Sequence, residues 1–209
     1  MKKWIALAFI IALFSLLAQT PGYWEVFDED ETGYKTVTFY GIIKEEYASD
    51  ASGRMRMVQD FSDLEDGDIL VTDSTYCFIY RHGHAAIVVD AEQGITLEAY
   101  GIGTKSELSR VSEWRRYPHM LVLRLDAPKE VRSAIADYAK EKLLGVPYRL
   151  TTGMIGDKDM RGKYWGTQCA HLVWAAFYEF GYDIDGDGGW LVSPEDFVKS
   201  SHLYQVPQK

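Results

Sequence analysis

The segment YWGTQCAHLVWAAFYEFG, residues 164–181, carries the pattern that decides the fold. It predicts an amphipathic helix that begins at Cys169, with Thr167 as its N-cap, and ends at Gly181. Cys169 then faces the interior from the first helical turn, where unpaired N–H groups and the helix dipole favour a thiolate nucleophile. The alternative interpretation is a small buried hydrophobic residue. The apolar face, at i+3, i+4, i+7, i+8 and i+11 from Cys169, consists of Leu172, Val173, Ala176, Phe177 and Phe180.

The amino-terminal residues have the form of an export signal. Lys2 and Lys3 precede an uncharged apolar run, residues 4–18. This order is typical of a secretory signal peptide, which we assign to residues 1–20. The alternative is a retained membrane anchor, since no charge follows until Glu25 and roughly 20 apolar residues span a bilayer. Both interpretations predict an extracytoplasmic protein, and membrane contact is expected only if the segment is retained.

The composition indicates one globular domain with an acidic surface. The chain has 209 residues, of which 47% are hydrophobic, enough for a single well-formed core. Without Lys2 and Lys3 it has 20 basic and 31 acidic residues, a net charge of about −11. A nucleic-acid ligand is therefore not expected, since phosphate contacts need a basic face. An anionic membrane surface is disfavoured for the same reason.

The chain has two cysteines, Cys77 and Cys169. Two are too few for a disulfide scaffold. A single bridge between them remains an alternative, and it would block the proposed nucleophile and leave a structural protein. Without that bridge, Cys77 is interpreted as buried and inert, because it lies in an apolar strand-like segment.

Short apolar segments separated by turns predict an α+β domain with an antiparallel sheet and a few helices. A turn at 64–68 leads into a strand at 69–72, and the segments 85–89 and 95–100 flank Gly94 as a hairpin. We divide the exported part into an N-terminal arm, 21–63, and a domain, 64–209. The other expected elements are a strand at 35–40 in a leading arm or hairpin, a strand at 120–125, a helix after Pro128 capped by Asp126 and ended by Gly145, a long loop at 146–168 with a role in binding, a helix start at 193–197 and a strand at 203–206.

A histidine far upstream of Cys169 is the candidate general base. His84 precedes the apolar strand AAIVV, from which it can reach a helix N-terminus packed on the same sheet and act as a general base. Glu98 lies on the next strand, where a carboxylate can orient the imidazole and stabilise its charged form. The alternatives are a strand-end histidine with a backbone partner and a half-exposed strand carboxylate.

Five segments together resemble the YiiX-like branch of the NlpC-type cysteine hydrolases. The resemblance covers roughly residues 64 to 206 and implies a circularly permuted papain-like fold. The histidine strand precedes the cysteine helix here, as in the permuted group, whereas in unpermuted members it follows. The segments are GDIL at 67–70, GHAAIV at 83–88, GVPY at 145–148, QCAHLVW at 168–174 and SP at 193–194.

The resemblance implies a role for each matching residue. Cys169 would be the nucleophile, His84 the general base and later the acid, and Glu98 the orienting residue. Tyr148 would line the catalytic pocket and supply a second oxyanion donor beside the Cys169 N–H. Its alternative role is an aromatic loop residue that covers the core. His171 is expected at the rim of the site, because it points about a third of a turn away from the buried helix face.

The implied reaction is attack of the thiolate on an acyl carbon, with a thioester intermediate that water hydrolyses. The expected substrate is an amide bond in peptidoglycan stem peptides. An ester or lipid acyl hydrolase, an acyltransferase, and a binding module for a cell-wall peptide or lipid remain alternatives. Five aromatic residues are candidates to line the cleft or to pack beside it: Trp114, Tyr148, Tyr164, Trp165 and Trp174.

Asp183, Asp185 and Asp187 form the D-x-D-x-D-G opening of a calcium loop. The closing glutamate of such a loop belongs at the twelfth position, which is Pro194, and Glu195 comes one residue late. A turn-forming acidic loop is therefore the simpler interpretation. Calcium, if bound, would be a structural ion, and the proposed chemistry requires no cofactor.

Overall fold

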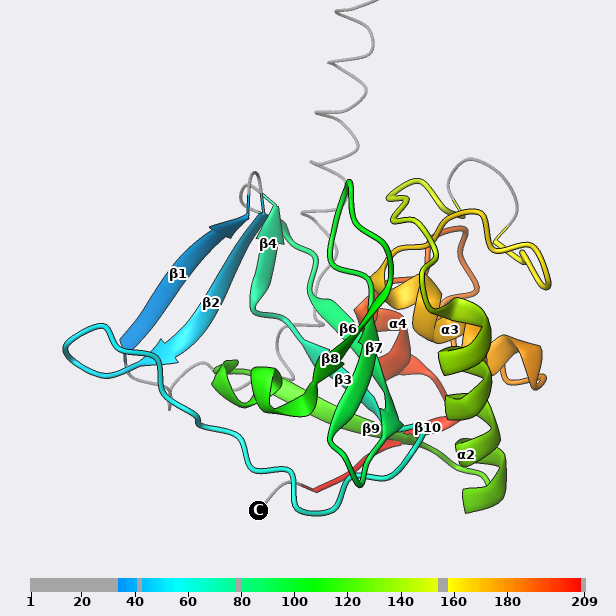
Figure 1. Ribbon diagram of the computed structural model, residues 1–209, viewed down its shortest axis with the longest axis horizontal. Helices are drawn as coiled ribbons and strands as arrows, with labels where there is room; N and C mark the ends of the chain where they lie inside the picture. Colours follow the sequence, from blue (N-terminus) through cyan, green and yellow to red (C-terminus); the bar gives the residue numbers. More distant parts are fainter. Residues whose placement is uncertain (1–33, 41–42, 78–79, 154–157, 208–209) are drawn as a thin grey trace, which may run out of the picture.

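The computed structural model describes residues 34–40, 43–77, 80–153 and 158–207. The fold is α+β, with antiparallel sheets and a few helices, as predicted (Figure 1). The segment 1–20, interpreted as an export signal, lies outside the described residues. In the part of the chain that is described, no helix is long and apolar enough to cross a membrane.

The larger sheet has six strands in the order β10-β9-β3-β6-β7-β8, and every neighbouring pair is antiparallel. The central strands β3 and β6 are buried along almost their whole length, which explains why their sequences are continuous apolar runs. The predicted hairpin around Gly94 joins β6 to β7. The strands are β3 (Ile69–Thr72), β6 (His84–Asp90), β7 (Ile95–Glu98), β8 (Glu107–Arg110), β9 (Met120–Leu125) and β10 (Leu203–Gln205).

The smaller sheet contains the leading segment, which was predicted as an arm or a hairpin and forms an antiparallel hairpin. Its strand order is β1-β2-β4-β5. Strand β2 pairs on one side with β1 and on the other with β4, which comes from the predicted domain 64–209. The hairpin is therefore hydrogen-bonded to the rest of the fold. Its strands are β1 (Tyr34–Tyr40) and β2 (Ile43–Ser49), followed in this sheet by β4 (Thr75–Cys77) and β5 (Tyr80–Arg81).

Helices α2 and α4 lie at the positions predicted from the sequence, but the predicted N-cap of α2 is wrong. Helix α4 begins at the predicted SP segment, and the structure adds a capping box between Ser193 and Asp196. Asp126 does not cap α2, because Pro128, with an extended ψ of 147°, takes the N-cap position, and Asp126 is left exposed. The helical elements are the 3₁₀ helix η2 (Val111–Arg116), α2 (Lys129–Tyr138) with its π-helical extension η3 (Ala139–Leu143), α3 (Cys169–Glu179) and α4 (Pro194–Lys199).

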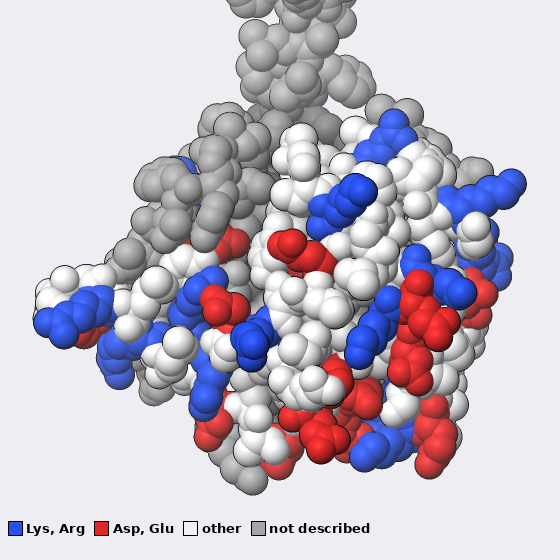
Figure 2. Space-filling model, in the orientation of Figure 1, with Lys and Arg blue, Asp and Glu red and all other residues white. Residues whose placement is uncertain are grey.

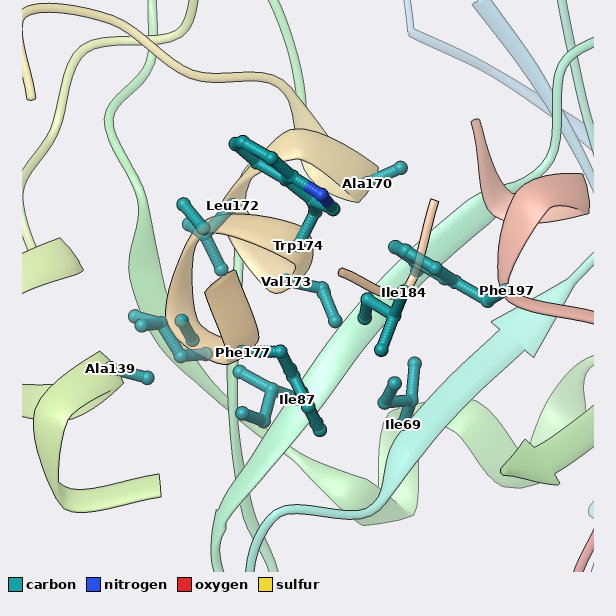
Figure 3. Close-up of a cluster of buried hydrophobic side chains, with 14 of the residues drawn as sticks. Ile69, Ile87, Ala139, Ala170, Leu172, Val173, Trp174, Phe177, Ile184 and Phe197 are labelled. Carbon is teal, nitrogen blue, oxygen red and sulfur yellow. The ribbon is translucent and has the colours of Figure 1, made fainter. Parts of the chain in front are cut away.

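The six-stranded sheet is covered differently on its two faces. Helices α2, α3 and α4 pack on one face, where Val173 and Phe177 of α3 lie against the strand residue Ile87 (Figure 3). The other face carries a second cluster, in which Tyr47 from the leading hairpin packs with Trp114 and strand residues. Hairpin and helices thus lie on opposite sides of the sheet (Figure 1). On the molecular face seen in Figure 2, basic and acidic side chains are interspersed.

The turn before β3 is held by a buried ion pair. Asp68 is fully buried, and its two carboxylate oxygens accept from Arg124 Nε at 2.7 Å and from a terminal guanidinium nitrogen at 2.8 Å. Burial raises the pKa of Asp68 despite these bonds. The preceding Gly67 has a φ of 84°, and a Cβ there would lie 2.7 Å from the Arg132 carbonyl oxygen. This turn therefore requires the glycine, and Arg124 compensates the buried charge of Asp68.

Candidate active site

Helix α3 begins at Cys169 as predicted, but its cap is different. Gln168, and not Thr167, is the N-cap: its Oε1 accepts from the Ala170 N–H at 2.8 Å, and its Nε2 donates to the Val192 carbonyl at 2.6 Å. The prediction of Thr167 was wrong because it rested on the usual preference for short hydroxyl side chains at this position. The Gln168 side chain reaches the same N–H group from one residue closer.

Cys169 carries a free thiol and is 8% exposed. The thiol donates to Gln168 Oε1 at a donor–acceptor distance of 3.5 Å. A bridge between Cys169 and Cys77 is therefore not formed. The Cys77 side chain lies outside the described part, so its interpretation as a buried, inert residue stays a prediction.

His84 is the first residue of β6, and its ring connects Cys169 to Glu98. It is 4% exposed, and its Nε2 lies 3.0 Å from Glu98 Oε2. The Cys169 side chain also interacts with the imidazole, and this interaction favours the protonated ring. Burial opposes the charged imidazolium, but the hydrogen bonds and charges of Cys169 and Glu98 outweigh it and raise the pKa of His84 to about 10. The structure thus brings together the three residues predicted as the catalytic set.

Glu98 is held as a buried carboxylate by three side-chain donors. Besides His84, Thr96 Oγ1 donates to Oε1 at 2.5 Å and Trp114 Nε1 donates to it at 3.0 Å. Burial opposes the ionised form, yet the hydrogen bond and charge of His84, followed by Thr96 and Trp114, lower the pKa of Glu98. The alternative of a half-exposed strand carboxylate is wrong, because Glu98 is 1% exposed.

Two aromatic rings enclose the imidazole of His84. Trp114 stacks on it with a centroid distance of 5.3 Å and an interplanar angle of 14°. Tyr100 stacks at 5.4 Å and 22°. Trp114 was expected as a cleft or packing residue, and its contacts with both His84 and Glu98 were not foreseen. Stacked rings of this kind restrain the imidazole and favour its protonated form.

The remaining aromatic candidates lie in different environments. Trp174 is buried, and the Tyr164 hydroxyl bonds with that of Tyr138 at 2.8 Å. Trp165 is 45% exposed, with the guanidinium of Arg149 lying 4.1 Å from its ring centroid. Of this set, Trp165 is the residue placed on the surface near the start of α3.

Tyr148 is half-buried and packs against the main core. It forms a parallel bridge with Thr167, two residues before Cys169. Its N–H donates to the Thr104 carbonyl at 2.9 Å, and the Thr167 N–H donates to the Pro147 carbonyl at 3.0 Å. The long loop predicted at 146–168 is thereby attached to the start of α3. The packing agrees with the interpretation of Tyr148 as a core-covering residue, and its oxyanion role stays a prediction.

His171 is not a rim residue, as was predicted, but is 1% exposed. Its Nε2 donates to the Lys158 carbonyl at 2.9 Å, and its Nδ1 accepts from Thr167 Oγ1 at 2.9 Å. Burial lowers its pKa to about 4, so the ring is neutral. The helical projection missed this because the 158–167 segment covers that side of α3. His171 is a structural histidine with both ring nitrogens satisfied.

Replacing His171 with leucine should therefore affect stability and spare the reactivity of the thiol. The lost hydrogen bonds should cost about 1–3 kcal/mol of unfolding free energy, measured by urea unfolding. The rate at which iodoacetamide alkylates Cys169 should stay within about twofold of the wild-type rate, because His84 makes the contact with the thiol. A large loss of alkylation in the folded variant would assign His171 a part in activating Cys169.

The acidic loop brings two of its three predicted aspartates, Asp185 and Asp187, into one cluster. Asp183 turns away and accepts from Trp174 Nε1 at 2.8 Å. Carboxylate oxygens of Asp185, Asp187 and Asp196 do lie within 4.8 Å of one another. The Lys158 ammonium, however, pairs with Asp185 and also donates to the Gly189 carbonyl at 2.9 Å. Lys158 is thus a cationic partner of Asp185, and both the turn-forming loop and a structural calcium ion stay predictions.

Comparison with known proteins adds one relative. Over 148 residues the chain is 28% identical to the uncharacterized protein YycO of Bacillus subtilis strain 168. The similarity is distant. It covers 67% of this chain and 54% of YycO, so the chain spans about half the length of that relative. No model of a known protein family and no solved structure matches the chain.

The raised pKa of His84 predicts how stability depends on pH. Because the folded value of about 10 exceeds the ordinary 6.5, the contribution of His84 to stability is fully present below about pH 6.5. It is lost as the pH rises towards about 10. Urea unfolding of the wild type should show this decline, and His84→Gln should show a flatter curve over the same interval. Parallel curves for the two proteins would contradict the assignment.

Proposed function

We propose that this protein is an exported thiol hydrolase in which Cys169 is the nucleophile, His84 the general base and acid, and Glu98 the residue that orients His84. The observation that carries the proposal is the buried series from the Cys169 thiol through the His84 ring to the Glu98 carboxylate. Burying charged groups in a protein interior costs free energy unless they pair with one another. Buried groups with shifted pKa values are frequent at functional sites. The position of Cys169 at the start of a helix is typical of reactive cysteines.

We also propose that the fold is the circularly permuted papain-like fold of the YiiX-like branch of NlpC-type hydrolases. Two features support this. The histidine strand β6 precedes the cysteine helix α3 in the chain. Nε2 of His84 faces the Glu98 carboxylate, and Cys169 interacts with the same ring. The five segments that carry the resemblance lie on β3, β6, the loop after η3, the start of α3 and the start of α4.

The proposed reaction proceeds in two steps. The Cys169 thiolate attacks the carbonyl carbon of the substrate, and the carbonyl electron pair moves onto the oxygen. As the intermediate collapses, the C–N bond breaks and the His84 imidazolium donates its proton to the leaving amine, which leaves a thioester. Neutral His84 then takes a proton from water, whose oxygen attacks the thioester and releases a carboxylic acid and the thiolate. Glu98 stays ionised and holds the ring throughout.

The oxyanion is proposed to bind at the start of α3. The Cys169 N–H is at the first helical position, where no intrahelical acceptor exists. Preformed donors of this kind lower the barrier for acyl transfer. Tyr148, bridged to Thr167 beside this turn, is the proposed second donor through its hydroxyl. Tyr148→Phe tests that role, because it removes only the hydroxyl group.

The proposed substrate is an amide bond in a cell-wall peptide, which fits the expected extracytoplasmic location. The test is incubation of the purified protein with peptidoglycan fragments and, separately, with fatty-acyl esters and phospholipid vesicles, followed by mass spectrometry. A new amine and carboxylic acid, absent with Cys169→Ala, would support an amidase. Release from esters or lipids alone would support the lipid or ester acyl hydrolase. Binding without turnover, equal in wild type and Cys169→Ala, would overturn the enzymatic proposal.

A further inference from the structure

One aromatic side chain of the leading hairpin, Tyr47, lies in the core cluster that contains Trp114. Tyr47 lies on β2 and is 1% exposed. Its ring centroid is 5.5 Å from that of Tyr117, which in turn lies 5.3 Å from Trp114 at an interplanar angle of 67°. Trp114 stacks directly on His84. A continuous series of aromatic rings therefore connects the hairpin to the imidazole.

The Tyr47 ring is fixed on its other sides by charged groups. Its hydroxyl donates to Oε2 of Glu45, a carboxylate that is itself 6% exposed. The guanidinium carbon of Arg116 lies 4.4 Å from the Tyr47 ring centroid. Arg116 and Trp114 belong to the same short helix, η2. Tyr47 thus contacts η2 both through Arg116 and, through Tyr117, at the residue that follows the helix.

Trp114 has two contacts with the catalytic set, and both depend on its exact placement. Its N–H is one of three donors to the Glu98 carboxylate, and its ring covers one face of His84. A shift of η2 would lengthen the hydrogen bond and move the stacked ring at the same time. Misplacement of a catalytic group by about 1 Å can lower a rate by about 10²-fold. The position of η2 therefore matters for the proposed chemistry.

We infer that the β1–β2 hairpin completes the active site, with Tyr47 as a positioning residue that acts through Tyr117 and Trp114 on His84. This inference rests on the proposed function of Cys169 and His84. It assigns a role in the reaction to the arm at residues 21–63, which lies outside the segments that resemble the hydrolase family.

The test compares Tyr47→Leu and Tyr47→Phe with Phe197→Leu. Phe197 is a fully buried aromatic residue of the other core cluster and serves as the matched control. For each folded variant, the rate of Cys169 alkylation by iodoacetamide is measured against pH, together with thermal unfolding. The ionisable side chains that surround the His84 ring, and that shape this profile, are His82, Glu98, Tyr100 and Cys169.

Tyr47→Leu is expected to lower the alkylation rate at neutral pH by about 10-fold or more and to displace its pH profile. Tyr47→Phe keeps the ring and should stay within about threefold of the wild type. Phe197→Leu should lower Tm and leave the profile in place. If Tyr47→Leu does not fold, Tyr47→Met replaces it, because an unbranched side chain fills the space without supplying a ring.

Two outcomes separate this inference from the proposed function. If wild-type Cys169 reacts no faster than a small free thiol, and His84→Gln does not change its rate, the proposed function fails. If the wild type reacts fast and His84→Gln is slow, but the Tyr47→Leu or Tyr47→Met profile superimposes on that of Phe197→Leu, the role of the hairpin alone is overturned.

Discussion

Replacing His84 with glutamine is expected to lower kcat/KM for the cleaved substrate by about 10²–10⁴-fold, the range supplied by a positioned general acid–base group. Glutamine keeps a polar side chain beside Glu98 but has no group that titrates. Cys169 loses its interaction with the imidazole, and in the proposed reaction the leaving amine loses its proton donor. Steady-state kinetics on the substrate identified with peptidoglycan fragments or esters measure the effect.

Two further variants serve as controls for this result. Cys169→Ala should reduce turnover to background, because no thioester can form. His171→Leu should retain most of the wild-type kcat/KM, since its ring is neutral and bonded at both nitrogens. Wild-type kinetics in folded His84→Gln would remove His84 from the mechanism and with it the proposed reaction.

Replacing Arg124 with methionine is expected to lower the unfolding free energy by about 3–5 kcal/mol, the usual cost of leaving one member of a buried ion pair unpaired. Asp68 would keep its burial and lose both hydrogen bonds from the guanidinium group. For a chain of this size the loss corresponds to a fall in Tm of roughly 6–20 °C. Urea unfolding monitored by circular dichroism measures it.

The control for Arg124 is an exposed pair of the same type. Arg161 bonds to Asp159 through two guanidinium nitrogens, and both side chains are well exposed. Arg161→Met should therefore cost at most about 1 kcal/mol. Adding Asp68→Leu to Arg124→Met should recover part of the lost stability, because the uncompensated charge disappears. Equal losses for Arg124→Met and Arg161→Met would show that the burial of Asp68 has no energetic consequence.

The central strands and α3 could be predicted because the spacing of apolar residues within each element is enough to identify it. The apolar run after His84 is buried on both faces, and the i, i+3, i+4 spacing after Cys169 determines which helix face is inside. The three candidate catalytic residues were found for the same reason: each lies at the start or end of a strongly patterned element. Their order in the chain, with the histidine strand before the cysteine helix, was the further feature on which the resemblance to the permuted group rested.

The rest depends on contacts between residues that are distant in sequence. The burial of His171 is due to the 158–167 segment, whose path a helical projection does not contain. The contact of Trp114 with Glu98 requires η2, a six-residue 3₁₀ helix without an apolar period long enough to recognise. Gln168 caps α3 because Val192 holds its amide from another loop. Each is a tertiary effect that overrides a local preference.

The order of elements in this fold has a consequence for biosynthesis. Cys169 follows His84 by 85 residues, which at typical synthesis rates corresponds to roughly 4–17 s. The leading hairpin and the strand with His84 thus leave the ribosome well before the helix with the thiol. A nascent chain contains His84 and Glu98 first, and Cys169, the proposed nucleophile, is added last. In the proposed mechanism, the growing protein therefore has no activated thiol until most of the six-stranded sheet has been made.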